Sequence, residues 1–213
     1  MIKAIIFDND GVLTHTERTF FDVNKIIMSS LDVEYDESDF TEHTFNTNLG
    51  TSCWLHQKGY EKGFIDAFKT KRDHLFRKEI VKANTTEPTA LPALKALKQD
   101  YLLCIATNTR RAMFELTHGQ DEMYQLFDEV VCREDYKNTK PAPDAYLAAL
   151  EKIDVTASEA VVVEDSPRGI ASAKEAGIRV IAITNPHFSN LNTQQADFRI
   201  HSLTELPDLL TRL

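Results

Sequence analysis

Residues 2–17 read IKAIIFDNDGVLTHTE, and the interpretation of the rest of the chain starts from this stretch. An apolar run, interrupted only by one lysine, stops at the carboxylates of Asp8 and Asp10, with Gly11 directly after them. Continuous apolar runs that are rich in branched residues are typical of strands buried on both faces of a parallel sheet. Ligands of such sheets lie just beyond the carboxyl ends of the strands. The stretch therefore predicts a central strand that delivers two carboxylates to a binding edge, although a plain Asp/Gly turn would show the same residues.

The composition limits the classes of protein to which the chain can belong. With 213 residues it is long enough for one well-buried domain that carries a smaller inserted one. Its net charge of −9 argues against a nucleic-acid partner, but it leaves room for a local site that binds a small phosphorylated metabolite. The three cysteines are odd in number and far apart, which predicts neither a zinc site nor a disulfide framework and favours a reducing compartment. No apolar stretch approaches the length of a membrane span, so we expect a cytoplasmic protein without a membrane partner. The oligomeric state is not predicted.

The hydrophobic pattern changes twice along the chain. Residues 18–81 contain no strand-like run, and their apolar residues recur at helical spacing. Further along, apolar runs alternate with helical stretches. The strands that we expect there are residues 102–106, 130–131, 160–163, 180–183 and 198–200, and the helices are residues 91–97, 110–118, 143–150, 170–176 and 203–210. This alternation indicates βαβ units. The predicted fold is α/β, a Rossmann-like doubly wound parallel sheet (1–15 and 86–213) with an inserted all-helical cap domain (16–85).

Polar groups follow three of the predicted strands at their carboxyl ends, which places them at one edge of the sheet. They are Asp8 and Asp10, Thr107 and Asn108, and Glu164 and Asp165, to which we add Lys140 just before a predicted helix. Four carboxylates at one edge would repel one another unless a cation lies between them. Oxygen ligands without His or Cys suit Mg²⁺, and a hydroxyl, an amide and an ammonium group suit a phosphoryl group. One carboxylate can then be the nucleophile while its neighbour moves the proton.

These motifs resemble those of the haloacid dehalogenase-like (HAD) hydrolase superfamily, and within it the helical-cap phosphatases and β-phosphoglucomutase-like enzymes. The matching segments are DNDGVL (8–13), ATN (106–108), KPAPD (140–144) and VEDS (163–166). The resemblance covers the predicted core and leaves the cap without a matching motif. One departure is His15, where the family often has an acid; it affects the passage from core to cap rather than the phosphoryl chemistry.

The resemblance implies a role for each matching residue of the core. Asp8 is implied to attack phosphorus, and Asp10 to protonate the leaving group and activate water. The substrate phosphate would be bound by Thr107, by the backbone at Asn108 and by Lys140, which also balances charge. An acid at position 10 favours phosphoryl transfer over dehalogenation, because the aspartyl-phosphate must be hydrolysed with the help of a base.

The implied cofactor is Mg²⁺. Its implied ligands are Asp8, the backbone carbonyl of Asp10, Asp165, and Glu164 either directly or through water. These residues could also have purely structural roles. For example, Glu164, or the neighbouring Ser166, could simply cap the helix that follows. The seven histidines show no ligand spacing, and we expect them on the surface.

These residues favour one function and leave two alternatives open. The favoured function is a Mg²⁺-dependent phosphatase that hydrolyses a small phosphomonoester, such as a sugar phosphate or a phosphoglycolate-like metabolite, through an aspartyl-phosphate. The cap would close over the site and select the substrate. The first alternative is a β-phosphoglucomutase-like phosphomutase, which returns the phosphoryl group to a sugar hydroxyl. The second is a non-catalytic binding protein on the same fold.

Overall fold

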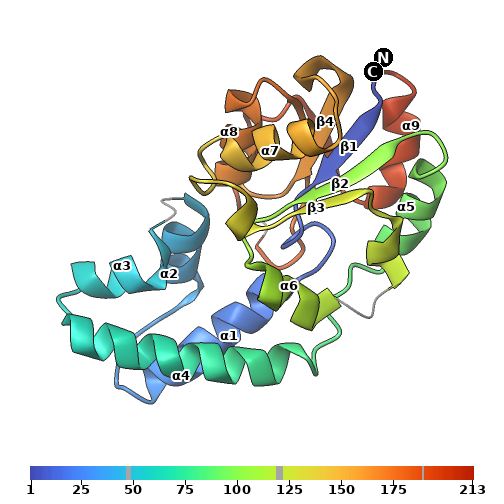
Figure 1. Ribbon diagram of the computed structural model, residues 1–213. Helices are drawn as coiled ribbons and strands as arrows, with labels where there is room; N and C mark the ends of the chain where they lie inside the picture. The colour runs from blue at the N-terminus through green and yellow to red at the C-terminus, as the bar shows by residue number, and fades with distance from the viewer. Residues whose placement is uncertain (47–48, 119–121, 189) are drawn as a thin grey trace. The chain divides into compact units, whose positions relative to one another are not determined.

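The computed structural model describes residues 1–46, 49–118, 122–188 and 190–213 of the chain (Figure 1). The chain forms two compact units, one made of residues 1–14 and 86–213 and the other of residues 15–85. No helix in the described part of the chain is both long and apolar enough to cross a membrane.

The larger unit is built on a parallel sheet, in which the described residues form six strands in the order β3-β2-β1-β4-β5-β6. The strands are β1 (Ala4–Phe7), β2 (Leu102–Ala106), β3 (Glu129–Val131), β4 (Ala160–Glu164), β5 (Arg179–Ile183) and β6 (Phe198–Ile200). The strand order reverses at β1, which lies between β2 and β4 (Figure 1). Open α/β sheets bind their ligands at such a reversal, beyond the carboxyl ends of the strands. The predicted parallel sheet and its strands are confirmed.

The two faces of the sheet bury two separate apolar layers. In β1, Ile5 and Phe7 face one layer, and Ala4 and Ile6 face the other, because successive side chains of a strand point to opposite faces. The first layer is covered by α5 (Ala90–Leu97), α6 (Arg111–His118) and α9 (Leu206–Leu210), and the second by α7 (Asp144–Lys152) and α8 (Pro167–Glu175). Burying a side chain such as Ile5 or Phe7 stabilises the fold by about 1.5–3 kcal/mol. Burial on both faces explains why the strands are continuous apolar runs.

The helices of this unit begin and end close to their predicted positions. Pro143 lies just before α7 instead of inside it, and Ser166 caps α8 by accepting a hydrogen bond from the backbone N–H of Gly169 at 3.1 Å. The predicted helix at residues 203–210 is a 3₁₀ turn followed by α9. The 3₁₀ turns of the unit are η2 (Glu122–Leu126), η3 (Arg133–Asp135), η4 (Ala157–Glu159) and η5 (Leu203–Glu205).

The smaller unit forms helices and turns but no strand in its described residues, 15–46 and 49–85, as the pattern predicted. Its elements are α1 (Thr16–Ser29), α2 (Glu37–Thr41), the π-helical turn η1 (Glu42–Asn46), α3 (Gly50–Gln57) and α4 (Lys62–Ile80). Asp36 and Asp39 form a capping box at the start of α2, since each side chain accepts a hydrogen bond from the other's backbone N–H.

An aromatic cluster forms the centre of the smaller unit. Tyr35 stacks on His43 with ring centroids 5.6 Å apart, and its hydroxyl lies 2.7 Å from His43 Nε2. Trp54 packs edge-on against Tyr35 at 5.3 Å. His43 is buried, and so is His118 of the larger unit, so the expectation that all histidines lie on the surface is wrong for both. Burial lowers the pKa of His43 to about 4 because the charged imidazolium loses its hydration.

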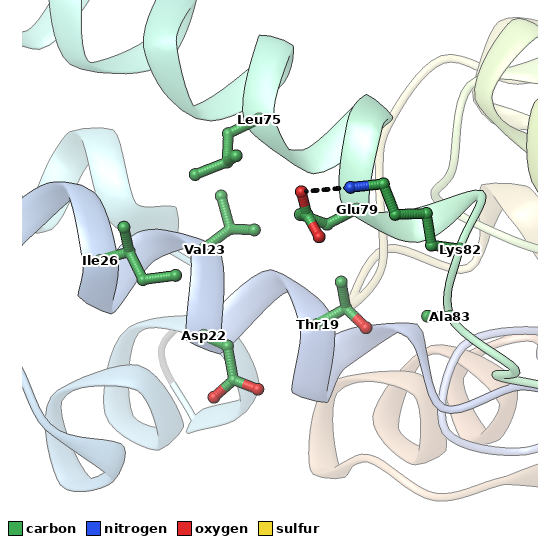
Figure 2. Close-up of a pocket in the computed structure, with 8 residues that line it drawn as sticks. All are labelled: Thr19, Asp22, Val23, Ile26, Leu75, Glu79, Lys82 and Ala83. Atoms are coloured by element: carbon green, nitrogen blue, oxygen red, sulfur yellow. Dashed lines mark hydrogen bonds and ion pairs between the residues drawn. The ribbon is translucent and has the colours of Figure 1, made fainter.

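A groove of about 600 Å³ lies between α1 and α4 of the smaller unit (Figure 2). Val23 of α1 and Leu75 of α4 point toward each other across it. At one end Glu79 pairs with Lys82 at 3.0 Å, and Asp22, which also lines the groove, pairs with Arg18 at 3.2 Å. Both lining carboxylates are thus paired with cations at the surface, and we assign no chemistry to this groove.

Acid should destabilise the folded protein through His43. The unfolded chain takes up a proton at this residue near pH 6.5, whereas the folded chain does so only near pH 4. The contribution of His43 to the unfolding free energy should therefore be complete above about pH 6.5 and fall by a few kcal/mol toward pH 4, at about 1.4 kcal/mol per pKa unit.

Urea unfolding of the wild type and of His43→Gln between pH 4 and 7, followed by the fluorescence of the single tryptophan, Trp54, measures this contribution. The wild type should lose more stability toward acid than the variant does. Equal pH dependence in the two proteins would show that His43 does not carry the effect.

Candidate active site

The carboxyl ends of three adjacent strands bring most of the predicted site residues to one edge of the sheet. Phe7 of β1 is level with Ile105 of β2 and with Val163 of β4. Asp8 follows Phe7 directly, Thr107 follows the end of β2, and Asp165 follows the end of β4. The edge forms because the three apolar runs end at the same level of a shared sheet.

Lys140 is the centre of the hydrogen-bond network at this edge. Its Nζ donates to Asp8 Oδ1 at 2.8 Å, to Glu164 Oε1 at 2.9 Å and to the carbonyl oxygen of Ala106 at 2.9 Å. It also lies 2.8 Å from the hydroxyl oxygen of Tyr146. Only 2% of Lys140 is exposed. Burial alone would lower the pKa of Lys140, but the carboxylates of Asp8 and Glu164 outweigh it and raise that pKa above its usual value.

Negative charge at this edge exceeds what one ammonium group can balance. Burial, with smaller contributions from Glu164 and Asp10, raises the pKa of Asp8 to about 7 against the opposing effect of Lys140. Burial, followed by repulsion from Glu164 and Asp8, also raises the pKa of Asp165 well above its usual value. The edge therefore favours the binding of a further cation, which would allow Asp8 and Asp165 to be ionised together.

Both carboxylate oxygens of Glu164 already accept hydrogen bonds from the protein. Oε1 accepts from Lys140 and from the Tyr146 hydroxyl, at 2.9 and 2.8 Å. Oε2 accepts from the backbone N–H of Asp165 at 3.0 Å and from the backbone N–H and hydroxyl of Ser166 at 3.1 and 2.9 Å. Burial raises the pKa of Glu164, but Lys140 and these donors hold it below its usual value. Glu164 is thus a buried anion that anchors Lys140 and the turn after β4.

The residues at the edge fit a divalent cation with oxygen ligands. Carboxylate oxygens of Asp8, Glu164 and Asp165 lie within 4.8 Å of one another. Oδ1 of Asp165 is buried, and no residue that the structure describes donates a hydrogen bond to it. A buried carboxylate oxygen needs a partner, and Mg²⁺ takes carboxylate oxygens as ligands. Because the oxygens of Glu164 are occupied by other partners, the geometry favours Asp8 and Asp165 as direct ligands.

Two threonine hydroxyls hold the carboxylate of Asp10. Thr107 Oγ1 donates to Asp10 Oδ2 at 3.2 Å, and Thr109 Oγ1 donates to the same oxygen at 2.9 Å. The backbone N–H of Thr109 in turn donates to Thr107 Oγ1 at 3.0 Å. Sequence reasoning selected Thr107 as a phosphate ligand and missed Thr109, although the alternating hydroxyls of the TNT segment (107–109) were a visible signal.

The side chain of Asn108 has a structural role. Its Oδ1 accepts hydrogen bonds from the Tyr136 hydroxyl at 2.8 Å and from the backbone N–H of Lys140 at 3.2 Å. These bonds tie the turn after β2 to the segment that carries Lys140. A role of Asn108 in phosphate binding would therefore use its backbone.

A second polar cluster includes Asn9, the residue between Asp8 and Asp10 in the loop after β1. Asn9 is fully buried, its Nδ2 lies 3.2 Å from His118 Nε2, and the Tyr124 hydroxyl donates to its Oδ1 at 3.1 Å. The His118 and Tyr124 rings stack with centroids 4.3 Å apart. This cluster was not predicted from the sequence. The one local signal for it was Asn9, a polar residue between two aspartates.

Comparisons with known proteins identify relatives of the chain. A family model described as "Haloacid dehalogenase-like hydrolase" matches residues 5–183. The "Phosphorylated carbohydrates phosphatase" of Thermotoga maritima is 33% identical, over 84% of this chain and 84% of that protein. "(DL)-glycerol-3-phosphatase 2" of Arabidopsis thaliana is 28% identical, over 96% of this chain and 88% of that protein.

Solved structures share the fold. The chain is similar to CbbY from Rhodobacter sphaeroides in complex with phosphate, with a TM-score of 0.78, 24% identity and coverage of 97% of this chain and 96% of that one. It is also similar to a HAD hydrolase, family IA, variant 3, from Entamoeba histolytica, with a TM-score of 0.81, 24% identity and coverage of 96% and 95%. These similarities confirm the predicted sheet with an inserted helical cap.

Close packing behind Glu164 leads to a prediction for Gly169. A Cβ atom at this position would lie 1.6 Å from Glu164 Oε1, so alanine must displace the buried carboxylate. Gly169→Ala should lower the unfolding free energy by roughly 1–3 kcal/mol. Gly63→Ala in α4 is the matched control, because a Cβ there meets nothing within 4 Å. The control should be neutral or stabilise by up to about 1 kcal/mol. Thermal unfolding of the two variants measures the difference, and equal midpoints would contradict the packing described.

Proposed function

The chain belongs to the haloacid dehalogenase-like hydrolase family, and on that basis we propose that it is a Mg²⁺-dependent phosphatase acting on a small phosphomonoester. Membership of this family confirms the resemblance and the enzyme class predicted from the four motifs. The observation that supports the proposal most strongly is the position of Asp8. Its Oδ1 is held by Lys140 at 2.8 Å, and one of its carboxylate oxygens lies within 4.8 Å of one from Asp165. A carboxylate in this position can approach a phosphoryl group whose negative charge is balanced by Lys140 on one side and by a bound cation on the other.

Asp8 is the proposed nucleophile. Lys140 stabilises its ionised form and binds Oδ1, which leaves Oδ2 for the attack on phosphorus. In the first step the Asp8–phosphorus bond forms, the bond from phosphorus to the ester oxygen breaks, and Asp10 gives its proton to that oxygen. In the second step water attacks phosphorus, Asp10 takes a proton from it, and the bond to Asp8 breaks. Inorganic phosphate leaves, and both aspartates return to their starting states.

Thr107 and Thr109 orient Asp10 for these proton transfers. Both hydroxyls bind the same oxygen, Oδ2, and so restrict the orientation of the Asp10 carboxyl group. The backbone N–H of Asn108 is a proposed ligand of the phosphate oxygens. Thr107 is proposed as a second ligand, its one hydroxyl proton turning from Asp10 to the phosphate, and Lys140 balances charge between Asp8 and the phosphate.

Asp8, Asp165 and the backbone carbonyl of Asp10 are the proposed Mg²⁺ ligands. Bound Mg²⁺ would supply positive charge against the phosphoryl oxygens. Glu164 contributes mainly by holding Lys140, and any contact of Glu164 with the metal would pass through water, because both of its oxygens accept protein hydrogen bonds.

The substrate that we propose is a small phosphorylated polyol or sugar. The two curated relatives are named for glycerol-3-phosphate and for phosphorylated carbohydrates, and the acidic character of this chain disfavours a nucleic-acid substrate. We further propose that residues 16–85 act as the cap domain that selects this substrate, and that the enzyme is cytoplasmic.

Phosphate release from a panel of small phosphomonoesters tests the proposed function. Release should require Mg²⁺, stop on addition of EDTA, and fall by about 10³-fold or more in Asp8→Asn, which removes the nucleophile without changing its size. Transfer to a second sugar hydroxyl that depends on a bisphosphate primer, without net release, would instead identify a phosphomutase. Neither reaction in a folded protein would favour a binding protein.

The hydroxyl of Thr109 should matter for turnover. Thr109→Val removes one of two donors to Asp10, and a hydrogen bond to a charged group contributes about 1.5–3 kcal/mol. The variant should lose about 10- to 100-fold in kcat with a smaller change in KM. Thr109→Ser keeps the hydroxyl and should retain most of the activity. Steady-state kinetics of the two variants decide the matter, and similar losses in both would assign the effect to packing.

A further inference from the structure

We propose that Asn185 is a positioning residue for Asp165 and thereby sets the affinity of the site for its divalent cation. This inference rests on the proposed function, because it takes Asp165 to be a metal ligand. Asn185 lies in the turn after β5, two residues beyond the end of this strand, which pairs with β4. It is 4% exposed, and no sequence motif pointed to it.

The orientation of the Asn185 amide is determined by its partners. Its Oδ1 accepts hydrogen bonds from the backbone N–H groups of His187 and Phe188 at 2.9 and 3.1 Å. An amide oxygen accepts and an amide nitrogen donates, so the Nδ2 end must face the other way. There it donates to Asp165 Oδ2 at 2.6 Å. The turn after β5 thus fixes the orientation of the Asn185 amide, and this amide in turn fixes the orientation of the Asp165 carboxylate.

The opposite side of the Asp165 carboxylate is limited by the loop after β1. A Cβ atom on Gly11 would lie 2.0 Å from Asp165 Oδ2, so the glycine backbone packs directly against this oxygen. Gly11 has a φ of +89°, which favours glycine for a second reason. With Oδ2 held between Asn185 and Gly11, the carboxylate keeps one orientation.

This orientation leaves the second carboxylate oxygen of Asp165, Oδ1, available for a cation. Within the described residues, Oδ1 of Asp165 is buried without a hydrogen-bond partner. Asp165 also belongs to the cluster in which one carboxylate oxygen each of Asp8, Glu164 and Asp165 lie within 4.8 Å of one another. Asn185 therefore occupies the one oxygen and presents the other toward the place where a cation would balance three carboxylates. A neutral amide suits this task, because it donates a hydrogen bond without adding a positive charge that would compete with the metal.

Residues that orient metal ligands in this way have a measurable effect on affinity. Loss of such a partner typically weakens metal binding by 10- to 100-fold. The alternative is that Asn185 only stabilises the turn at residues 185–188, in which case its loss would change stability and leave cation affinity unaltered.

Asn185→Ser separates the two roles. The shorter hydroxyl side chain can still accept a hydrogen bond from the turn, as serine commonly does, but it cannot reach Asp165. Asn192→Ala is the matched control, because Asn192 Oδ1 accepts from the backbone N–H of Gln194 at 3.2 Å in the same connection between β5 and β6. Both variants lose an asparagine from a turn, and only one loses the contact to Asp165.

The experiment is calorimetric titration of Mg²⁺ into the wild type, Asn185→Ser, Asn185→Ala and Asn192→Ala, with thermal midpoints of the metal-free proteins measured in parallel. The two Asn185 variants should bind Mg²⁺ about 10- to 100-fold more weakly than the wild type, and Asn185→Ser should do so with a midpoint close to that of the wild type. Asn192→Ala should bind as the wild type does.

Wild-type affinity in a folded Asn185→Ser would overturn the inference and leave the proposed phosphatase untouched. An equal loss of affinity in Asn192→Ala would also overturn it, because the effect would then come from the connection as a whole. A wild type that does not bind Mg²⁺ would overturn the proposed metal dependence itself, and the inference with it.

Discussion

One buried ammonium group joins the parts of this site. Lys140 comes from the segment before α7, yet its Nζ binds Asp8 after β1 and Glu164 at the end of β4. Removing one member of such a buried set leaves an uncompensated charge and typically costs about 3–5 kcal/mol. The convergence of three strand ends and one loop therefore depends on this lysine, and Tyr146 and Ser166 complete it by satisfying the oxygens of Glu164.

The same interaction explains why the site favours a cation. The single charge of Lys140 balances one of the three buried carboxylates, and burial raises the pKa of Asp8 and of Asp165. A divalent cation would balance that excess charge. Each carboxylate has its own restraint before any ligand arrives: Asp8 is held by Lys140, Asp10 by two threonine hydroxyls, and Asp165 by Asn185. Such preorganisation avoids reordering charged groups during the reaction.

The secondary structure could be predicted from the sequence, whereas the contacts between residues far apart in the chain could not. Apolar runs and helical spacing depend on neighbouring residues, so all six described strands and the helical insertion could be predicted. The partners of buried polar groups depend instead on contacts between distant segments. His118 meets Asn9 across 109 positions, and Thr109 meets Asp10 across 99. A histidine without ligand spacing gave no sign of burial, and neither Tyr146 nor Asn185 belonged to a recognised pattern.

The proposed covalent intermediate on Asp8 can be trapped chemically. Protein that is turning over a phosphomonoester is quenched, reduced with borohydride and digested, and the peptide that contains residues 4–17 is examined by mass spectrometry. An acyl-phosphate on Asp8 is reduced to an alcohol, so the account predicts homoserine at position 8 in the presence of substrate and Mg²⁺, and its absence when either is omitted. Phosphate release with an unmodified Asp8, or with the modification on another residue, would contradict the account.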